Sequence, residues 1–199
     1  HAALAEAHLQ LGEDQQAEEE ALAAFRLAGS LPDRERLRVE ARYYRTIRKW
    51  DRAIAAYRGL WDPHPEDLES GLELARCQLA GYRYRDAAAT IAALRRGSGG
   101  GEDGRIDLLE GDLAAARGDS LKRLEAARRA VEKGERHGAG SLVAQAHLQR
   151  AWANQQLGRL DDARVSLAAA RRSVGELGHD LLRARLLHFD SALARARAA

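Results

Sequence analysis

Five positions recur along this chain at a nearly constant interval, and alanine occupies four of them. Each position follows a short break in a helical pattern and belongs to the start of a second helix. Successive positions lie 36, 34, 36 and 40 residues apart: Ala17, Ala53, Ala87, Arg123 and Ala163. A fixed period in this range is typical of stacked helical hairpins rather than of one globular core. The repeat pattern therefore favours a function in binding over one in catalysis.

The residue composition indicates an all-α chain. Ala, Leu, Arg, Glu and Gln are good helix formers and dominate the 199 residues, whereas there are only 3 Pro and few β-branched residues. The formal net charge of +2, from 32 basic and 30 acidic residues, is too small to indicate a nucleic-acid or membrane partner. No run approaches the roughly 18 apolar residues of a membrane span.

The single cysteine and the start of the chain bear on its location. Cys77 excludes an intrachain disulfide, and its apolar helical surroundings predict an inert, buried thiol. We therefore expect a cytoplasmic protein, or a periplasmic one if a parent protein carries a membrane span. The chain starts at His1 inside a helical pattern, without a signal peptide, so we expect a fragment of a longer protein.

Glycine and proline breaks divide the chain into hairpins. Asp14 is the expected N-cap of the first hairpin's second helix. The glycine-rich stretch 97–104 is expected to be a flexible connection and a hinge within a single repeat domain. The expected hairpins span about 1–29, 33–62, 65–96, 104–136 and 140–176. A last helix over 179–198 caps the array or begins a sixth hairpin.

Laid over one another, the five units resemble the tetratricopeptide repeat (TPR), a helix-turn-helix of about 34 residues with small side chains where its helices cross. The fifth unit matches best, with Gly158 at the turn and Ala163 on the second helix. The second unit supplies Ala41 and Ala53 and closes with Pro65. The resemblance implies a right-handed superhelix of about five antiparallel hairpins that binds proteins. It implies neither a catalytic role nor a cofactor.

Two units depart from the pattern. The third has Gly71 where a large apolar residue is usual, and the fourth has Arg123 at the small position of its second helix. We therefore expect irregular packing around the fourth unit. The overall pattern is also similar to TPR regions of bacterial Ser/Thr protein kinases and winged-helix regulators, although these residues contain neither a kinase signature nor a recognition helix.

Motifs for chemistry are weak. Residues 99–104 match G-x-G-x-x-G, but a helix leads in and two acidic residues would repel phosphate. No histidines pair at i, i+4 and no nucleophile motif occurs, so we expect no metal site and no catalytic residue. His147 is expected to be a packed, hydrogen-bonded imidazole. The arginine pairs 95–96, 128–129 and 171–172 suit helix C-termini; a nucleic-acid ridge is the alternative.

In TPR proteins the first helices line a concave groove that holds peptides. Carried over by resemblance, the candidate partner-binding residues are Arg38, Arg42, Arg45, Arg76, Gln149, Trp152 and Gln156. The arginines would make one half of the groove cationic, and Trp152 would be an aromatic anchor among adaptable amides. In the alternative, these side chains have no ligand, and Trp152 packs against the next hairpin. The Lys and Asn pattern of the chaperone-tail carboxylate clamp is absent.

Two functional hypotheses follow. In the first, the chain is an interaction scaffold whose groove binds an acidic or mixed-charge peptide, or a neighbouring domain of its parent protein. In the second, it is a regulatory sensor, in which a small ligand or self-association controls an attached kinase or DNA-binding domain.

Overall fold

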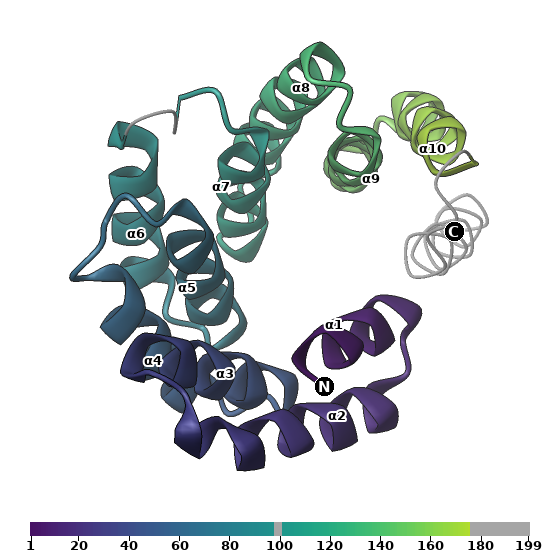
Figure 1. Ribbon diagram of the computed structural model, residues 1–199. Helices are drawn as coiled ribbons and strands as arrows, with labels where there is room; N and C mark the ends of the chain where they lie inside the picture. The colour runs from purple at the N-terminus through teal and green to yellow at the C-terminus, as the bar shows by residue number, and fades with distance from the viewer. Residues whose placement is uncertain (98–100, 176–199) are drawn as a thin grey trace. The chain divides into compact units, whose positions relative to one another are not determined.

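The computed structural model describes residues 1–97 and 101–175, which form helices joined by short turns, with no strand among them (Figure 1). The predicted last helix, 179–198, and residues 98–100 of the predicted hinge lie outside the described residues. The all-α fold class is confirmed. The α-helices are α1 (Ala2–Leu11), α2 (Asp14–Leu27), α3 (Asp33–Thr46), α4 (Trp50–Trp61), α5 (Leu68–Ala80), α6 (Tyr84–Arg96), α7 (Gly104–Ala116), α8 (Ser120–Arg136), α9 (Gly140–Gln156) and α10 (Leu160–Gly175).

The helix bounds agree with the predicted hairpins to within three residues. The first helices of the hairpins are α1, α3, α5, α7 and α9; the second helices are the even-numbered ones. The largest difference is the start of α5, which begins after Asp67 because this carboxylate caps the helix and accepts from Ser70 N at 3.2 Å. The prediction of Asp14 as an N-cap is wrong. Glu13 precedes the helix, and Asp14 instead accepts from Arg48 at 3.1 Å.

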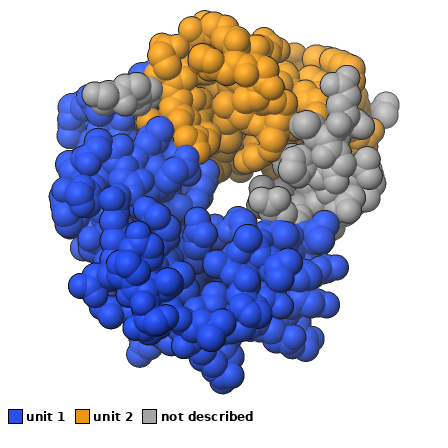
Figure 2. Space-filling model, viewed as in Figure 1, with its two compact units in different colours: residues 1–101 blue, residues 102–199 orange. Residues whose placement is uncertain are grey.

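The chain divides into two compact units, residues 1–101 and 102–199 (Figure 2). Unit 1 contains α1 to α6, and unit 2 contains α7 to α10. The boundary falls inside the glycine-rich stretch 97–104. The hinge at this stretch stays a prediction, and each unit is described by itself.

The helices of each hairpin cross in one register. The predicted anchor is the fourth residue of every second helix, and a small residue of the first helix stands 12 positions before it. Alanine side chains let two helix backbones approach closely. In four hairpins both residues are alanines that are at most 5% exposed: Ala5 and Ala17, Ala41 and Ala53, Ala75 and Ala87, and Ala151 and Ala163. The period in the sequence is therefore the period of this crossing.

The turn inside each hairpin needs one residue with a left-handed backbone, five positions before the anchor. Glycine supplies it in three hairpins, at Gly12, Gly118 and Gly158. Arg48 (φ 56°) and Tyr82 (φ 60°) adopt it in the other two. This conformation costs a residue with a side chain roughly 1–2 kcal/mol, so the packing of these hairpins overrides the local preference.

The fourth hairpin is built differently at its crossing. Gly111 stands on α7, and a Cβ there would lie 2.0 Å from Gln149 Oε1, so the missing side chain makes room for a glutamine of α9. Arg123 occupies the anchor and is partly buried. Burial lowers the pKa of Arg123, and the nearby Asp112 partly offsets this effect. The fully buried alanines of α8 lie further along the helix, at Ala127 and Ala130, which are both 0% exposed.

Gly71 of α5 also has a packing reason. A Cβ at this position would lie 2.5 Å from Leu94 Cδ2 and 2.7 Å from Trp61 Nε1. Trp61 packs against the core cluster that includes Leu60 and Leu74. The large side chain that is usual at this repeat position is absent because the indole ring of Trp61 occupies the space.

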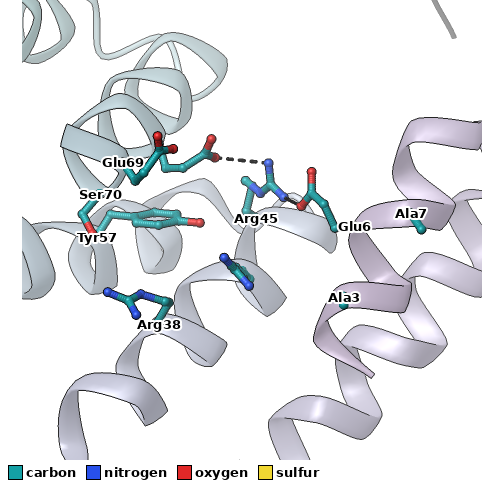
Figure 3. Close-up of a pocket in the computed structure, with 10 residues that line it drawn as sticks. Ala3, Glu6, Ala7, Arg38, Arg45, Tyr57, Glu69 and Ser70 are labelled. Atoms are coloured by element: carbon teal, nitrogen blue, oxygen red, sulfur yellow. Dashed lines mark hydrogen bonds and ion pairs between the residues drawn. The ribbon is translucent and has the colours of Figure 1, made fainter. Parts of the chain in front are cut away.

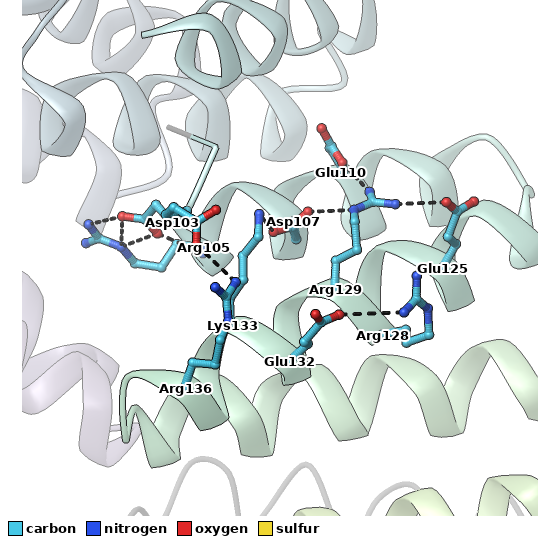
Figure 4. A network of polar contacts seen from close by, with 11 residues as sticks. Asp103, Arg105, Asp107, Glu110, Glu125, Arg128, Arg129, Glu132, Lys133 and Arg136 are labelled. Atoms are coloured by element: carbon cyan, nitrogen blue, oxygen red, sulfur yellow. Dashed lines mark hydrogen bonds and ion pairs between the residues drawn. The ribbon is translucent and has the colours of Figure 1, made fainter. Parts of the chain in front are cut away.

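Unit 2 contains a buried ion-pair network between α7 and α8 (Figure 4). Asp107 is 0% exposed, and its carboxylate accepts from Arg129 Nε at 2.8 Å and from Lys133 Nζ at 2.7 Å. Arg129 also donates to Glu110 and Glu125. The cost of burying these charged groups is offset because each one pairs with a group of opposite charge. Arg129 is thus engaged inside the fold, which disfavours its use on a nucleic-acid ridge.

Candidate partner-binding surface

Unit 1 has a hollow of about 520 Å³ along its first helices (Figure 3). Helices α1, α3 and α5 supply nine of the ten lining residues, and Tyr57 of α4 supplies the other. First helices therefore form most of this wall, as the resemblance implies. The lining residues are Ala3, Glu6, Ala7, Arg38, Arg42, Arg45, Tyr57, Glu69, Ser70 and Glu73.

Arg45 connects three first helices at this hollow. Its Nη1 donates to Glu73 Oε2 of α5 at 3.1 Å, and its Nη2 donates to Glu6 of α1. Burial acts to lower the pKa of Arg45, but the negative charges of Glu73 and Glu6 and the nearby Tyr57 outweigh it and hold the pKa above its usual value. The charge of Arg45 is therefore balanced by carboxylates within the protein. Arg45 holds the three helices of the wall together and does not offer an unpaired cation to a ligand.

The other two arginines of α3 are less engaged. Arg38 Nη2 lies 3.6 Å from Asp67 Oδ2, a carboxylate that also accepts from Arg34 at 3.0 Å. Arg42 is exposed, and its guanidinium forms no ion pair with any residue that the structure describes. Of the three arginines in the hollow, Arg42 thus has the most N–H donors without a partner. The charge of Arg38 is only partly balanced by Asp67.

Tyr57 brings a hydroxyl from a buried side chain to the same wall. The residue is only 3% exposed and packs in the core cluster with Leu60 and Leu74. Its hydroxyl is directed into the hollow and makes no hydrogen bond with the described residues (Figure 3). Burial, assisted by the charge of Glu73, raises the pKa of Tyr57 above its usual range, so the hydroxyl stays a donor.

The arginines were predicted to make this surface cationic, but acidic residues line it as well. Glu6, Glu69 and Glu73 line the hollow together with the three arginines of α3, so its wall is mixed in charge. Arg76 is not part of this wall. It pairs with Glu73 and lines a second hollow of about 260 Å³, with Leu9 among its other residues.

The three predicted residues of α9 lie in unit 2 and take part in its packing. Gln149 is 8% exposed, and its Nε2 donates to a backbone carbonyl of α7 at 3.0 Å and to Asp112 Oδ1 at 2.7 Å, so this amide is engaged in the packing of unit 2. Trp152 is partly buried against the core cluster of α9 and α10, which are the two helices of its own hairpin; the predicted packing against the next hairpin falls outside the described residues. Gln156 is exposed, and its Oε1 accepts from Ser120 Oγ at 2.8 Å.

Two further predictions concern buried titratable groups. Cys77 is 1% exposed, and burial raises the pKa of its thiol to about 12, which confirms a buried thiol with little reactive thiolate. His147 is partly buried, but its Nδ1 has no hydrogen-bond partner among the described residues, so the predicted hydrogen bond is wrong at this atom. Burial, followed by the charges of Arg150 and Arg172, lowers the pKa of His147 to about 4.

Sequence reasoning missed the hydroxyl of Tyr57 and the acidic partners of Arg45. The resemblance assigned the surface to first helices, whereas Tyr57 stands on a second helix. Glu6 and Glu73 are 39 and 28 residues from Arg45, distances that no local spacing indicates. The sequence signal that could have indicated this hydroxyl was a tyrosine, Tyr57, at a core position of α4.

Neither a metal site nor a membrane span is found within residues 1–97 and 101–175. No group of three or more His, Cys, Asp or Glu there could hold a metal ion, and no helix there has the length and apolarity needed to cross a membrane.

No protein-family model matches the sequence, and no curated protein matches it significantly. Among solved structures, the chain is similar to the crystal structure of a thermophilic TPR protein from Thermus thermophilus. The two share 20% sequence identity with a TM-score of 0.73, over 94% of this chain and 95% of that chain. The similarity shows that this chain has the helical-repeat fold of a TPR protein.

Proposed function

We propose that this chain is a protein-interaction scaffold that binds an extended peptide, or an exposed segment of a partner domain, in the hollow of unit 1. The observation that carries the proposal is the wall of first-helix residues, in which Arg42 has no ion-pair partner among the described residues. The mechanism is recognition without turnover. It requires no metal and no cofactor.

The charges of the wall favour one kind of peptide. Three glutamates balance three arginines in the lining, so a uniformly acidic ligand gains no net attraction, whereas Arg38 and Arg42 favour at least one acidic group in it. A mixed-charge peptide therefore suits the hollow better than a purely acidic one.

Selection of random displayed peptides on the whole chain tests the proposal. We expect enriched peptides whose affinity falls about tenfold or more in Arg42→Glu, because a charge-assisted hydrogen bond is replaced by repulsion. Arg85→Glu is the matched control, since Arg85 is an exposed arginine of α6 outside the hollow. Circular dichroism verifies that both variants stay folded. Absence of enriched peptides, or equal binding by Arg42→Glu and the unaltered chain, would contradict the proposal.

The sensor hypothesis makes a different prediction for the same protein. It requires a small ligand that raises the melting temperature, or a dimer, whereas the scaffold requires neither. A thermal-shift screen of small molecules and analytical ultracentrifugation distinguish the two. Attachment of the chain to a kinase or a winged-helix regulator belongs to this second hypothesis.

A further inference from the structure

Two polar groups in the hollow of unit 1 have no partner among the described residues. The hydroxyl of Tyr57, on a side chain that is 3% exposed, is directed into the hollow (Figure 3), and the guanidinium of Arg42 lines the same space. Tyr57 is close enough to Arg42 for the arginine's charge to affect the hydroxyl's ionisation. Both groups are donors at neutral pH. A ligand atom that lies between them would have to be an acceptor.

The surrounding charges restrict that acceptor further. Arg38 lines the same space, but Asp67, whose Oδ2 lies 3.6 Å from Arg38 Nη2, balances part of its charge. The net positive charge of this part of the hollow is therefore modest. The lining of the hollow carries three arginines and three glutamates, so its formal charges balance, and a doubly charged anion would leave a larger excess of negative charge there than a singly charged one. A singly charged carboxylate fits this balance, whereas a phosphate dianion does not.

We propose that Arg38, Arg42 and the hydroxyl of Tyr57 form a subsite for a single carboxylate of the bound peptide. This inference rests on the proposed function, because it assumes that the peptide occupies this hollow. Arg42 offers the paired donors that match a carboxylate, and Tyr57 donates the hydrogen bond that it lacks in the free protein. The carboxylate comes from an acidic side chain or from the peptide's C-terminus.

Peptide analogues identify the group and its source. The probe is the tightest peptide from the displayed-peptide selection, synthesised with each Asp or Glu changed to Asn or Gln and, separately, with an amidated C-terminus. We expect one of these changes to reduce affinity about tenfold or more and the others to have little effect. A side-chain change that has this effect assigns the source to an acidic residue; the amidated terminus assigns it to the C-terminus.

Tyr57→Phe and Arg42→Gln test the protein side. Each should weaken the parent peptide, by about threefold to tenfold for Tyr57→Phe and about tenfold for Arg42→Gln, and should remove most of the effect of the sensitive amide change. Tyr82→Phe and Arg85→Gln change the same residue types outside the hollow and should not affect affinity. Tyr57→Phe should keep or raise the melting temperature, because the hydroxyl that it removes has no partner among the described residues.

The outcomes separate this inference from the proposed function. Peptides that bind and lose affinity in Arg42→Glu, yet tolerate every amide change and Tyr57→Phe, would overturn the carboxylate subsite and leave the scaffold intact. A phosphoserine peptide that binds more tightly than its glutamate form would overturn the choice of a singly charged group. Failure of all peptides to bind would overturn both.

Discussion

Replacing Asp107 by alanine is expected to destabilise unit 2 by about 3 kcal/mol. Asp107 is 0% exposed, and it accepts from Lys133 Nζ at 2.7 Å and from Arg129 Nε at 2.8 Å. Breaking a buried ion pair by removing one partner typically costs about 3–5 kcal/mol. We expect the lower end because Arg129 keeps Glu110 and Glu125 as partners. Lys133, whose side chain is 10% exposed, loses its contact with Asp107.

Urea unfolding followed by circular dichroism measures this loss. With a slope of about 2 kcal/mol per molar urea, a loss of about 3 kcal/mol lowers the midpoint by about 1.5 M. Glu132→Ala is the control, on the helix that carries Arg129 and Lys133, since Glu132 is 61% exposed and pairs with Arg128 at 3.6 Å across one helical turn. An exposed pair of this kind contributes about 0.5 kcal/mol or less.

The double variant Asp107→Ala, Lys133→Met isolates the charge pair. Because the methionine no longer brings a positive charge into the interior, the double variant should recover about half or more of the stability lost in Asp107→Ala. A single variant that unfolds like Glu132→Ala, or a double variant whose loss equals the sum of its two single losses, would refute the reasoning.

Two other predictions concern packing and pH. Gly71→Ala should destabilise the protein by about 1–2 kcal/mol, because its Cβ meets the rigid indole of Trp61 at 2.7 Å, whereas Gly59→Ala meets only the end of a flexible leucine and should be neutral or stabilising; equal urea midpoints would contradict this. The low pKa of His147, about 4 against 6.5, means that the unfolded chain binds a proton that the folded chain rejects, so stability should fall as pH decreases through this window. His147→Leu should flatten that decline between about pH 7 and about pH 5, and an unchanged decline would assign it to other groups.

Helix positions were predictable because they depend on local signals. Glycine and proline breaks, together with helix-forming stretches, located ten helices to within three residues of their bounds in the part of the chain that the structure describes. The alanine period also identified the crossing correctly, since a close approach between helices needs small side chains wherever it recurs. Asp14 was misassigned because the Gly12 turn places Glu13, not Asp14, at the cap.

The candidate site was predictable only in outline. Repeat positions placed Arg38, Arg42, Arg45 and Arg76 in one half of a groove; the first three line the hollow of unit 1, whereas Arg76 lines the second hollow. The same positions did not reveal that Gln149 is buried, because Gly111, 38 residues earlier, leaves the space that its amide fills. Repeat position specifies which way a side chain points from its own helix, but not what the neighbouring helix offers it.

By itself, the sequence determined an all-α array of hairpins, the crossing at each alanine anchor and the turn before it. These features depend on backbone geometry and side-chain size over short stretches of chain. The tertiary structure decided which arginine charges are balanced by carboxylates, since Arg45 meets Glu6 and Glu73 across the hollow whereas Arg42 meets no carboxylate among the described residues. Charge neutralisation depends on distances of a few ångströms between residues far apart in the chain, and only the packed helices set those distances.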